Sequence, residues 1–113
     1  MYGKIIHQDK YKTILEIPRA DWITKGQSLF GKDMFNWIFK CSNCGHFQSV
    51  KSVVEHNPLL KKEECLLWVH CVCEGWHTEG YGCDWALYGI FHNHTREVYT
   101  DKYRVYVFEF KGE

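Results

Sequence analysis

One short stretch decides how this sequence folds, and it reads Cys41-Ser42-Asn43-Cys44-Gly45. Two thiolates at this spacing, followed by a glycine, can turn tightly enough to present both sulfurs to one metal ion, as a tetrahedral zinc site with bonds of roughly 2.3 Å requires. A CxxC pair also serves redox enzymes, but a thioredoxin-like protein places it in a βαβ unit. Because strand-forming residues flank this pair on both sides, the stretch favours half of a zinc site over a redox centre.

The other half of the site must come from cysteines further along the chain. Cys73 stands beside Glu74 and Gly75, and Cys83 follows a Gly-Tyr-Gly run. Glycines permit the tight backbone paths that bring two chain segments to one ion. We therefore predict one structural zinc ion held by four thiolates: Cys41, Cys44, Cys73 and Cys83. Such a closed ligand set leaves no open coordination position for catalysis.

The remaining thiols and the histidines are the alternatives to this ligand set. Residues 66–73 form the strongest predicted strand, in which Cys71 lies too deep and is expected to be a buried thiol. Cys65 stands at the far end of that strand, about 25 Å from Cys73 at roughly 3.3 Å per residue. Four histidines are alternative ligands: His46, His77, His92 and His94. A further alternative is that the cysteines merely pack in a core.

Length and composition indicate one small domain. The chain has 113 residues, so we expect a single zinc-binding domain over residues 1–113. No apolar run approaches the roughly 20 residues that a membrane helix needs, and the N-terminus lacks the apolar core of a signal peptide. We therefore expect a soluble cytoplasmic protein without membrane contact. In that compartment thiols stay reduced, so its 6 cysteines are expected to be metal ligands or buried thiols.

Charge is unevenly distributed along the chain, although the formal net charge is zero. Residues 1–62 hold ten Lys or Arg and five acids, a net charge of +5, while residues 63–113 hold four against nine, a net charge of −5. Nucleic-acid-binding proteins usually carry a clear basic excess, which the whole chain lacks. The basic half keeps nucleic-acid binding open, since a folded surface can segregate charge.

The secondary structure predicted from the sequence is α+β. A strand over residues 11–17 ends at Pro18, and a helix follows over residues 19–30 until Gly31 stops it. The apolar stripe of this helix is Trp22, Ile23, Gly26, Leu29 and Phe30. We expect a short helix over 50–57 and further strands over 34–40, 47–50, 66–73, 85–91 and 103–110, with 98–99 joining the last. The predicted fold is a small antiparallel sheet with one main helix and a projecting zinc knuckle, which resembles a zinc ribbon.

No catalytic constellation emerges from the sequence. His92-Asn93-His94 shares its letters with the HNH nucleases, but those enzymes need well-separated His and Asn positions in a ββα-metal unit. The acids near Glu63 and Glu74 have no evident partner base, and no phosphate-cradling glycine loop is present. The sequence therefore favours a binding module, and an enzyme with a non-obvious site is the weaker alternative.

Four stretches together resemble a known family. They are GQSLFG at residues 26–31, WxFxCxxCGxxQ at 37–48, GCDWALYGIF at 82–91 and VFEF at 107–110. Over about residues 19–110 the chain is similar to a family of small uncharacterised proteins, encoded mostly by bacteriophages and prophages and known by a bacterial locus tag. The resemblance implies a phage-type origin and zinc on Cys41, Cys44, Cys73 and Cys83, although Trp76 replaces a usual basic residue. It implies no activity.

Two functions are expected from these observations. The first is a zinc-stabilised, phage-type accessory protein in the host cell cytoplasm that binds and modulates a host protein, for instance one of an antiviral defence system. Small size, zero net charge and an aromatic fraction of 17% motivate it. The second is a zinc-ribbon-like protein that binds nucleic acid. In this second function the phosphates would be bound by Lys40, Lys51, Lys61 and Lys62. Bases would stack on Phe47 or Trp37.

Overall fold

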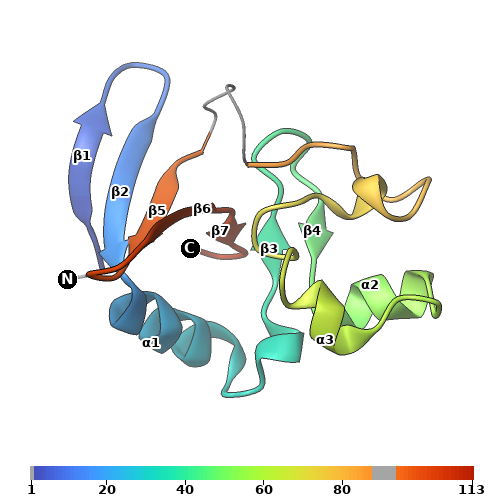
Figure 1. The fold of residues 1–113 in the computed structure, drawn as a ribbon. Helices are drawn as coiled ribbons and strands as arrows, with labels where there is room; N and C mark the ends of the chain where they lie inside the picture. The colour runs from blue at the N-terminus through green and yellow to red at the C-terminus, as the bar shows by residue number, and fades with distance from the viewer. Residues whose placement is uncertain (1, 88–93) are drawn as a thin grey trace.

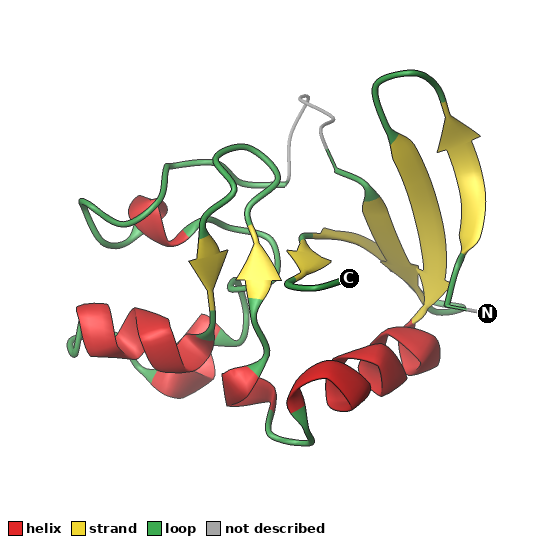
Figure 2. Cartoon of the chain, turned by 180° about the vertical axis from the view of Figure 1, so that it is seen from behind, coloured by secondary structure: helices red, strands yellow, loops and turns green. Residues whose placement is uncertain are grey.

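A computed structural model of the chain describes residues 2–87 and 94–113. These residues form two small β-sheets and three α-helices, connected by turns and loops (Figure 1). In both views the larger sheet and the lobe that carries α2 and α3 lie on opposite sides of the smaller sheet (Figure 2). This arrangement of helices and small sheets confirms the predicted α+β class.

The larger sheet has the strand order β1-β2-β5-β6. Its strands are β1 Lys4–Gln8, β2 Thr13–Pro18, β5 Arg96–Tyr99 and β6 Arg104–Val107. β2 runs parallel to β5, while the other two pairs are antiparallel. The sequence predicted β2 and a strand over residues 103–110 joined by 98–99, but that strand is divided, since β6 ends at Val107 and Glu109–Phe110 belong to the smaller sheet. The sequence missed β1, because all five of its residues are exposed and show no inward-facing apolar pattern. Since parallel neighbours need a long crossover, the chain between β2 and β5 leaves this sheet entirely and returns to it.

Helix α1, Arg19–Phe30, has the predicted bounds and follows directly from Pro18. Gly31 ends it with φ 88, a left-handed conformation that favours glycine. The predicted stripe faces the core, with Trp22 and Gly26 buried. Gly26 has a packing role as well, because a Cβ there would lie 2.5 Å from the Trp37 ring. The helix and the tryptophan therefore approach more closely than any larger residue would allow.

The smaller sheet has the order β4-β3-β7 and is antiparallel throughout. Its strands are β3 Phe39–Lys40, β4 Phe47–Gln48 and β7 Glu109–Phe110. The predicted strand over 34–40 is wrong in its first half, where Met34–Asn36 forms a 3₁₀ turn. Asp33 caps this turn by accepting the N–H of Phe35 at 3.0 Å, which competes with an extended strand. The predicted hairpin around the CxxC motif is confirmed.

The strand predicted over residues 66–73 is wrong. Helix α3, Lys62–Cys65, runs instead into a series of turns, and the N–H groups of Val69 and Val72 bond the carbonyls of Cys65 and Trp68. Burial follows the helical period, since Cys65, Val69 and Val72 are buried while Leu67 is exposed. A short apolar run cannot be assigned to strand or helix from periodicity alone. Here the segment folds into helical turns that bury one side of it.

Helix α2, Val50–His56, confirms the predicted helix over 50–57. Ser49 begins it with a reciprocal capping box, in which the Ser49 and Ser52 side chains each accept the other's backbone N–H. Of the strand predicted over 85–91, the structure shows one bridge between Ala86 and Val72, and residues 88–91 lie outside the described residues. Within the described residues, no helix combines the length and the apolar character that crossing a bilayer requires.

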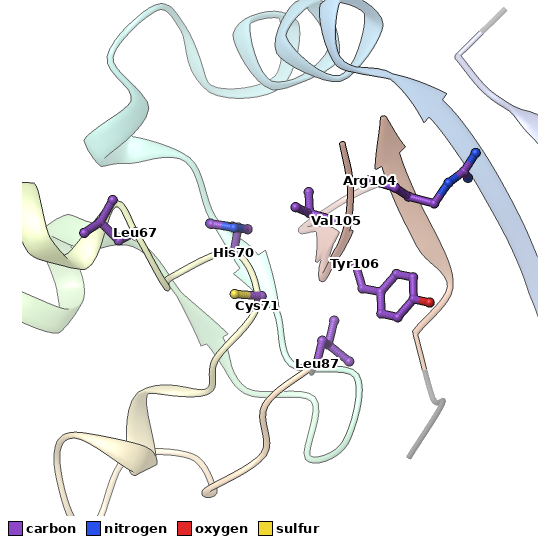
Figure 3. A pocket seen from close by; sticks show the side chains of 7 residues that line it. All are labelled: Leu67, His70, Cys71, Leu87, Arg104, Val105 and Tyr106. Atoms are coloured by element: carbon purple, nitrogen blue, oxygen red, sulfur yellow. The ribbon is translucent and has the colours of Figure 1, made fainter. Parts of the chain in front are cut away.

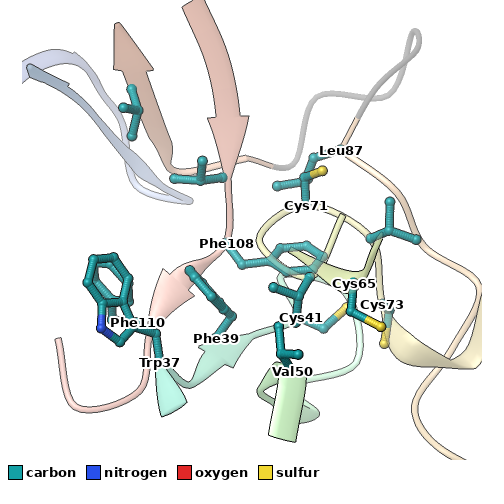
Figure 4. Close-up of a cluster of buried hydrophobic side chains, with 14 of the residues drawn as sticks. Trp37, Phe39, Cys41, Val50, Cys65, Cys71, Cys73, Leu87, Phe108 and Phe110 are labelled. Carbon is teal, nitrogen blue, oxygen red and sulfur yellow. The ribbon is translucent and has the colours of Figure 1, made fainter. Parts of the chain in front are cut away.

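One core joins the two sheets and the helices, and Figure 4 shows its central part. Trp22, Trp37, Phe39 and Phe110 form an aromatic cluster in which ring centroids lie 5.2–6.3 Å apart. Aromatic rings bury roughly 150–250 Å² each, so these four close much of the core of a small chain. The buried cysteines Cys41, Cys65, Cys71 and Cys73 border the same core.

Candidate metal centre

Four cysteine sulfurs converge at the tip of the β3–β4 hairpin. They belong to Cys41, Cys44, Cys73 and Cys83, and all four lie within 4.8 Å of one another. The Cys41–Cys83 and Cys44–Cys73 sulfurs are each 3.8 Å apart, too far for disulfides, and all four thiols are free. In a regular tetrahedron with zinc–sulfur bonds of roughly 2.3 Å the ligand sulfurs are about 3.8 Å apart. The group could therefore hold one metal ion.

The hairpin positions the first pair of sulfurs. The Cys41 N–H donates to the carbonyl of His46 at 2.9 Å, and the Gly45 N–H donates to the carbonyl of Cys41 at 3.0 Å. Gly45 has φ 78, so a glycine is favoured at this turn. The motif lies on a turn between two strands rather than at the start of a helix, which is the geometry of a metal-binding knuckle and not of a redox centre.

The second pair comes from a loop whose two ends are packed together. The N–H of Cys73 donates to the carbonyl of Trp85 at 2.8 Å, which fixes the backbone on both sides of the loop. A Cβ on Gly75 would lie 2.5 Å from the carbonyl oxygen of Cys83, and a Cβ on Gly82 would lie 2.5 Å from the Cys73 sulfur. The glycines beside the two cysteines are therefore required by close packing, as the sequence suggested.

Backbone amides also point at the sulfurs. The Cys83 N–H lies 3.2 Å from the Cys73 sulfur, and the Asn43 N–H lies 3.4 Å from the Cys41 sulfur. In the absence of metal, a hydrogen bond from the Cys41 thiol, together with the amides of Cys83 and Gly75, lowers the pKa of Cys73 to about 4. The same contact raises the pKa of Cys41. These donors stabilise negative charge on sulfur, and a metal ligand needs that form of the thiol.

The structure separates the predicted ligands from the alternatives. Within the described residues, these four cysteines are the only group of at least three His, Cys, Asp or Glu side chains that could hold a metal ion. Burial raises the pKa of Cys71 to about 11, in agreement with the prediction of a buried thiol. Cys65 is also buried outside the group, but the extended strand that was expected to hold it away does not exist.

The histidines have other partners. His46 bonds Glu74, His77 stacks on Trp68 with ring centroids 4.2 Å apart, and the Nε2 of His94 lies 2.9 Å from Glu97. His92 lies outside the described residues. His94 therefore belongs to the packing of the larger sheet.

A buried polar network beside the cysteines was missed from the sequence. The carboxylate of Glu74, which is fully buried, accepts from His46 at 2.7 Å and from His56 at 2.6 Å. The Gln48 amide receives the Glu74 N–H and donates to the carbonyls of Val69 and Val72. The network ties α2 and the turns after α3 to the cysteine loop. The side chains come from three separate segments of the chain, around residues 46–48, 56 and 74, so no local sequence pattern predicts the network.

A protein-family model described as VVA0879-like matches residues 18–111. The chain belongs to the VVA0879-like family. The match spans both halves of the cysteine group and the aromatic core, so it confirms the resemblance found in the sequence at the level of the family. Comparisons with curated proteins and with solved structures gave no match.

Proposed function

We propose that the four cysteines hold a structural zinc ion. Four thiolates without an oxygen or nitrogen donor are the ligand set of structural zinc sites, and the sulfur spacing matches that geometry. A closed set of this kind stabilises a fold and offers no position for a substrate. When bound, the ion would fix the β3–β4 hairpin to the loop that carries Cys73 and Cys83.

Zinc content tests this assignment. The protein purified from zinc-containing medium is expected to hold one zinc per chain, and Cys41→Ser or Cys83→Ser is expected to lose zinc together with the folded structure around the four cysteines. Cys71→Ser is the matched control, because Cys71 is buried but outside the group. Full zinc content in either ligand variant would show that the ligand set is wrong.

We further propose that this zinc-stabilised domain works by binding another protein. The observation that carries the proposal is the exposure of large apolar side chains in the segment that connects the cysteines. Leu67 is 76% exposed and Trp76 is 56% exposed. Residues 63–95 contain no Lys or Arg. Exposed aromatic and aliphatic side chains with little positive charge fit a protein partner better than a phosphate backbone.

The origin and the target are also part of the proposal. A phage or prophage origin, and a host protein such as an antiviral defence factor in the host cytoplasm as the target, rest on the family resemblance described above. Small size and the absence of an evident catalytic set in the sequence are compatible with a protein that acts by blocking or altering a partner.

Nucleic-acid binding through the basic half is the second candidate. Lys51 and Lys62 line one hollow of the surface, but Asp33 and Glu55 line it as well. Lys40 lines another hollow with Glu109. Trp37 is buried and is unavailable for stacking on a base, whereas Phe47 is exposed. The lysines are thus interspersed with acids, which weakens this candidate.

An affinity pull-down from bacterial host lysate, with and without nuclease, distinguishes the two candidates. Protein binding predicts a partner that is retained after nuclease treatment and lost when Trp76 and Leu67 are changed to Ser. Nucleic-acid binding predicts recovery that collapses after nuclease and affinity that falls steeply with salt. Loss of all partners on nuclease treatment would overturn the protein-binding proposal.

A further inference from the structure

An apolar cavity lies where α1, β3, β5, β6 and the turns after α3 meet, and its volume is about 390 Å³. Figure 3 shows a neighbouring hollow that shares three of its lining residues, namely Leu67 and His70 on the turns after α3 and Val105 on β6. The other lining side chains are mostly apolar or aromatic, among them Met34 and Val98. Cavities of roughly 300–1,000 Å³ with such linings are typical of small-molecule sites.

The aromatic cluster of the core forms one wall of this cavity. Trp22, Trp37 and Phe39 all line it. Their rings pack against one another, with the Trp22 centroid 5.7 Å from that of Trp37 and 6.3 Å from that of Phe39. Trp37 is fixed further, because its indole N–H donates to the carbonyl of Gly31 at 2.8 Å. The wall is therefore formed before any ligand binds, which lowers the entropic cost of binding.

One polar group in this wall lacks a partner. Trp22 is 8% exposed, and within the described residues its indole N–H has no hydrogen-bond acceptor. The rings of Phe39 and Phe110 lie at 26° and 22° to the Trp22 ring, so they cover its faces, whereas the N–H points outward in the ring plane. A buried donor without an acceptor costs free energy. Because Trp22 lines the cavity, a molecule bound there can supply the acceptor.

The charge of the cavity is concentrated beside that N–H. Arg19 lies three residues before Trp22 on α1, so the two side chains are neighbours on the same side of the helix. Burial lowers the pKa of His70, so its ring is uncharged at neutral pH. Of the described side chains that line the cavity, Arg19 is thus the only charged one, and no acid stands beside it.

These features select the chemistry of the ligand. Two neighbouring donors, a guanidinium and an indole N–H, are matched by the two oxygens of one carboxylate. A phosphate would bring a second negative charge, for which the described lining offers no second cation. A peptide would bring a backbone N–H at every residue, and among the described lining side chains only His70 and Tyr103 carry a nitrogen or oxygen acceptor. The rest of the lining fits a body without polar groups.

We propose that this cavity binds a small carboxylic acid with an apolar body. The body fills the space between the aromatic wall and Val105. The carboxylate accepts the indole N–H of Trp22 and pairs with the guanidinium of Arg19, which is exposed at the rim. This inference goes beyond the proposed function, and it depends neither on the zinc ion nor on a protein partner.

Two pairs of probes test the site: octanoate with octanamide, and phenylbutyrate with phenylbutyramide. Each amide has the same apolar body as its acid but no charge. N–H correlation NMR spectra of the isotope-labelled protein follow each titration, and sequential assignment identifies the Trp22 indole signal among those of the 5 tryptophans. At least one acid is expected to shift this signal in a saturable manner and to bind at least about tenfold more tightly than its amide.

Two variants separate the polar contacts from simple apolar binding. Arg19→Met is expected to weaken binding of the acid at least about tenfold and to leave binding of the amide unchanged. Lys32→Met is the matched control, because Lys32 is exposed after α1 and does not line the cavity. Trp22→Phe keeps an aromatic ring without the N–H, so it should also weaken binding of the acid. Circular dichroism shows whether each variant is folded, and the exposed Arg19 position decides the test if Trp22→Phe is not.

Equal binding of acid and amide, or an unchanged preference for the acid in Arg19→Met, would overturn the proposal. Shifts confined to residues outside the cavity, such as the exposed Trp76, would do the same. So would the lack of any shift of the Trp22 indole signal with either acid at concentrations up to about 10 mM. Zinc content and the capture of a protein partner are measured separately, so a failure of this site is distinguishable from a failure of the proposed function.

Discussion

The cysteine lobe, which here means residues 39–87 with β3, β4, α2, α3 and the four cysteines, and the larger sheet are stabilised in different ways. In the lobe, β3 and β4 have two residues each, and loops make up most of residues 57–87. In the larger sheet, strands of four to six residues pair along their length over buried Ile17 and Val98, with one irregularity in the β1–β2 pair. Short strands and long loops give little free energy of folding by themselves. The comparison predicts that the lobe depends on the proposed zinc ion and that the sheet does not.

Metal removal is expected to have the largest effect. Binding free energies of roughly 10–16 kcal/mol for structural zinc exceed the total stability of many small domains. Treatment with a strong chelator should therefore unfold the lobe. Amide hydrogen exchange should show early loss of protection at Cys41 and Cys73, while Ile17 and Val98 in the sheet exchange later. If both regions lost amide protection at the same rate, the claim that only the cysteine lobe depends on the metal would be wrong.

Removing packing from the larger sheet should affect stability without affecting metal. Ile17 is fully buried, so Ile17→Ala should lower the free energy of unfolding by about 2–5 kcal/mol. Ile5→Ala, on the neighbouring strand, is the control because Ile5 is 52% exposed. Denaturant unfolding measures both variants, and zinc per folded chain should stay at one. If Ile17→Ala lowered the zinc content, the stability of the cysteine lobe would depend on the larger sheet, which this account does not predict.

Two glycines in the cysteine loop test how closely the lobe is packed. Gly82→Ala places a Cβ 2.5 Å from the Cys73 sulfur at φ 76, and it should cost about 3 kcal/mol together with loss of zinc affinity. Gly80→Ala has φ 92 but meets nothing within 4 Å, so it should cost only about 1 kcal/mol. Thermal unfolding and zinc competition compare the pair. Equal costs would mean that the steric contact with the sulfur is unimportant.

The smallest effect is expected at the surface of the larger sheet. Arg104 pairs with Glu16 and Glu97, and these contacts raise its pKa. Its side chain is 43% exposed, so solvent screens the pairs and Arg104→Ala should cost about 1 kcal/mol or less. The cost should shrink further in high salt. A cost of several kcal/mol in denaturant unfolding would show that this ion pair is a main support of the sheet.

Local signals in the sequence predicted much of both regions. Pro18 and Gly31 delimit α1, and the CxxC motif with its following glycine predicted the hairpin and half of the cysteine group. The segment over 66–73 was mispredicted, because a continuous apolar run has no period that separates strand from helix. Glu74 with His46 and His56 was missed because their pairing spans 18–28 residues and depends on how the lobe folds.

X-ray absorption spectroscopy at the zinc edge tests the central claim most directly. The account predicts four sulfur ligands at about 2.3 Å from zinc in the intact protein, and loss of that signal in Cys83→Ser. A nitrogen or oxygen ligand at about 2.0–2.1 Å, or protein that folds fully without zinc, would contradict it.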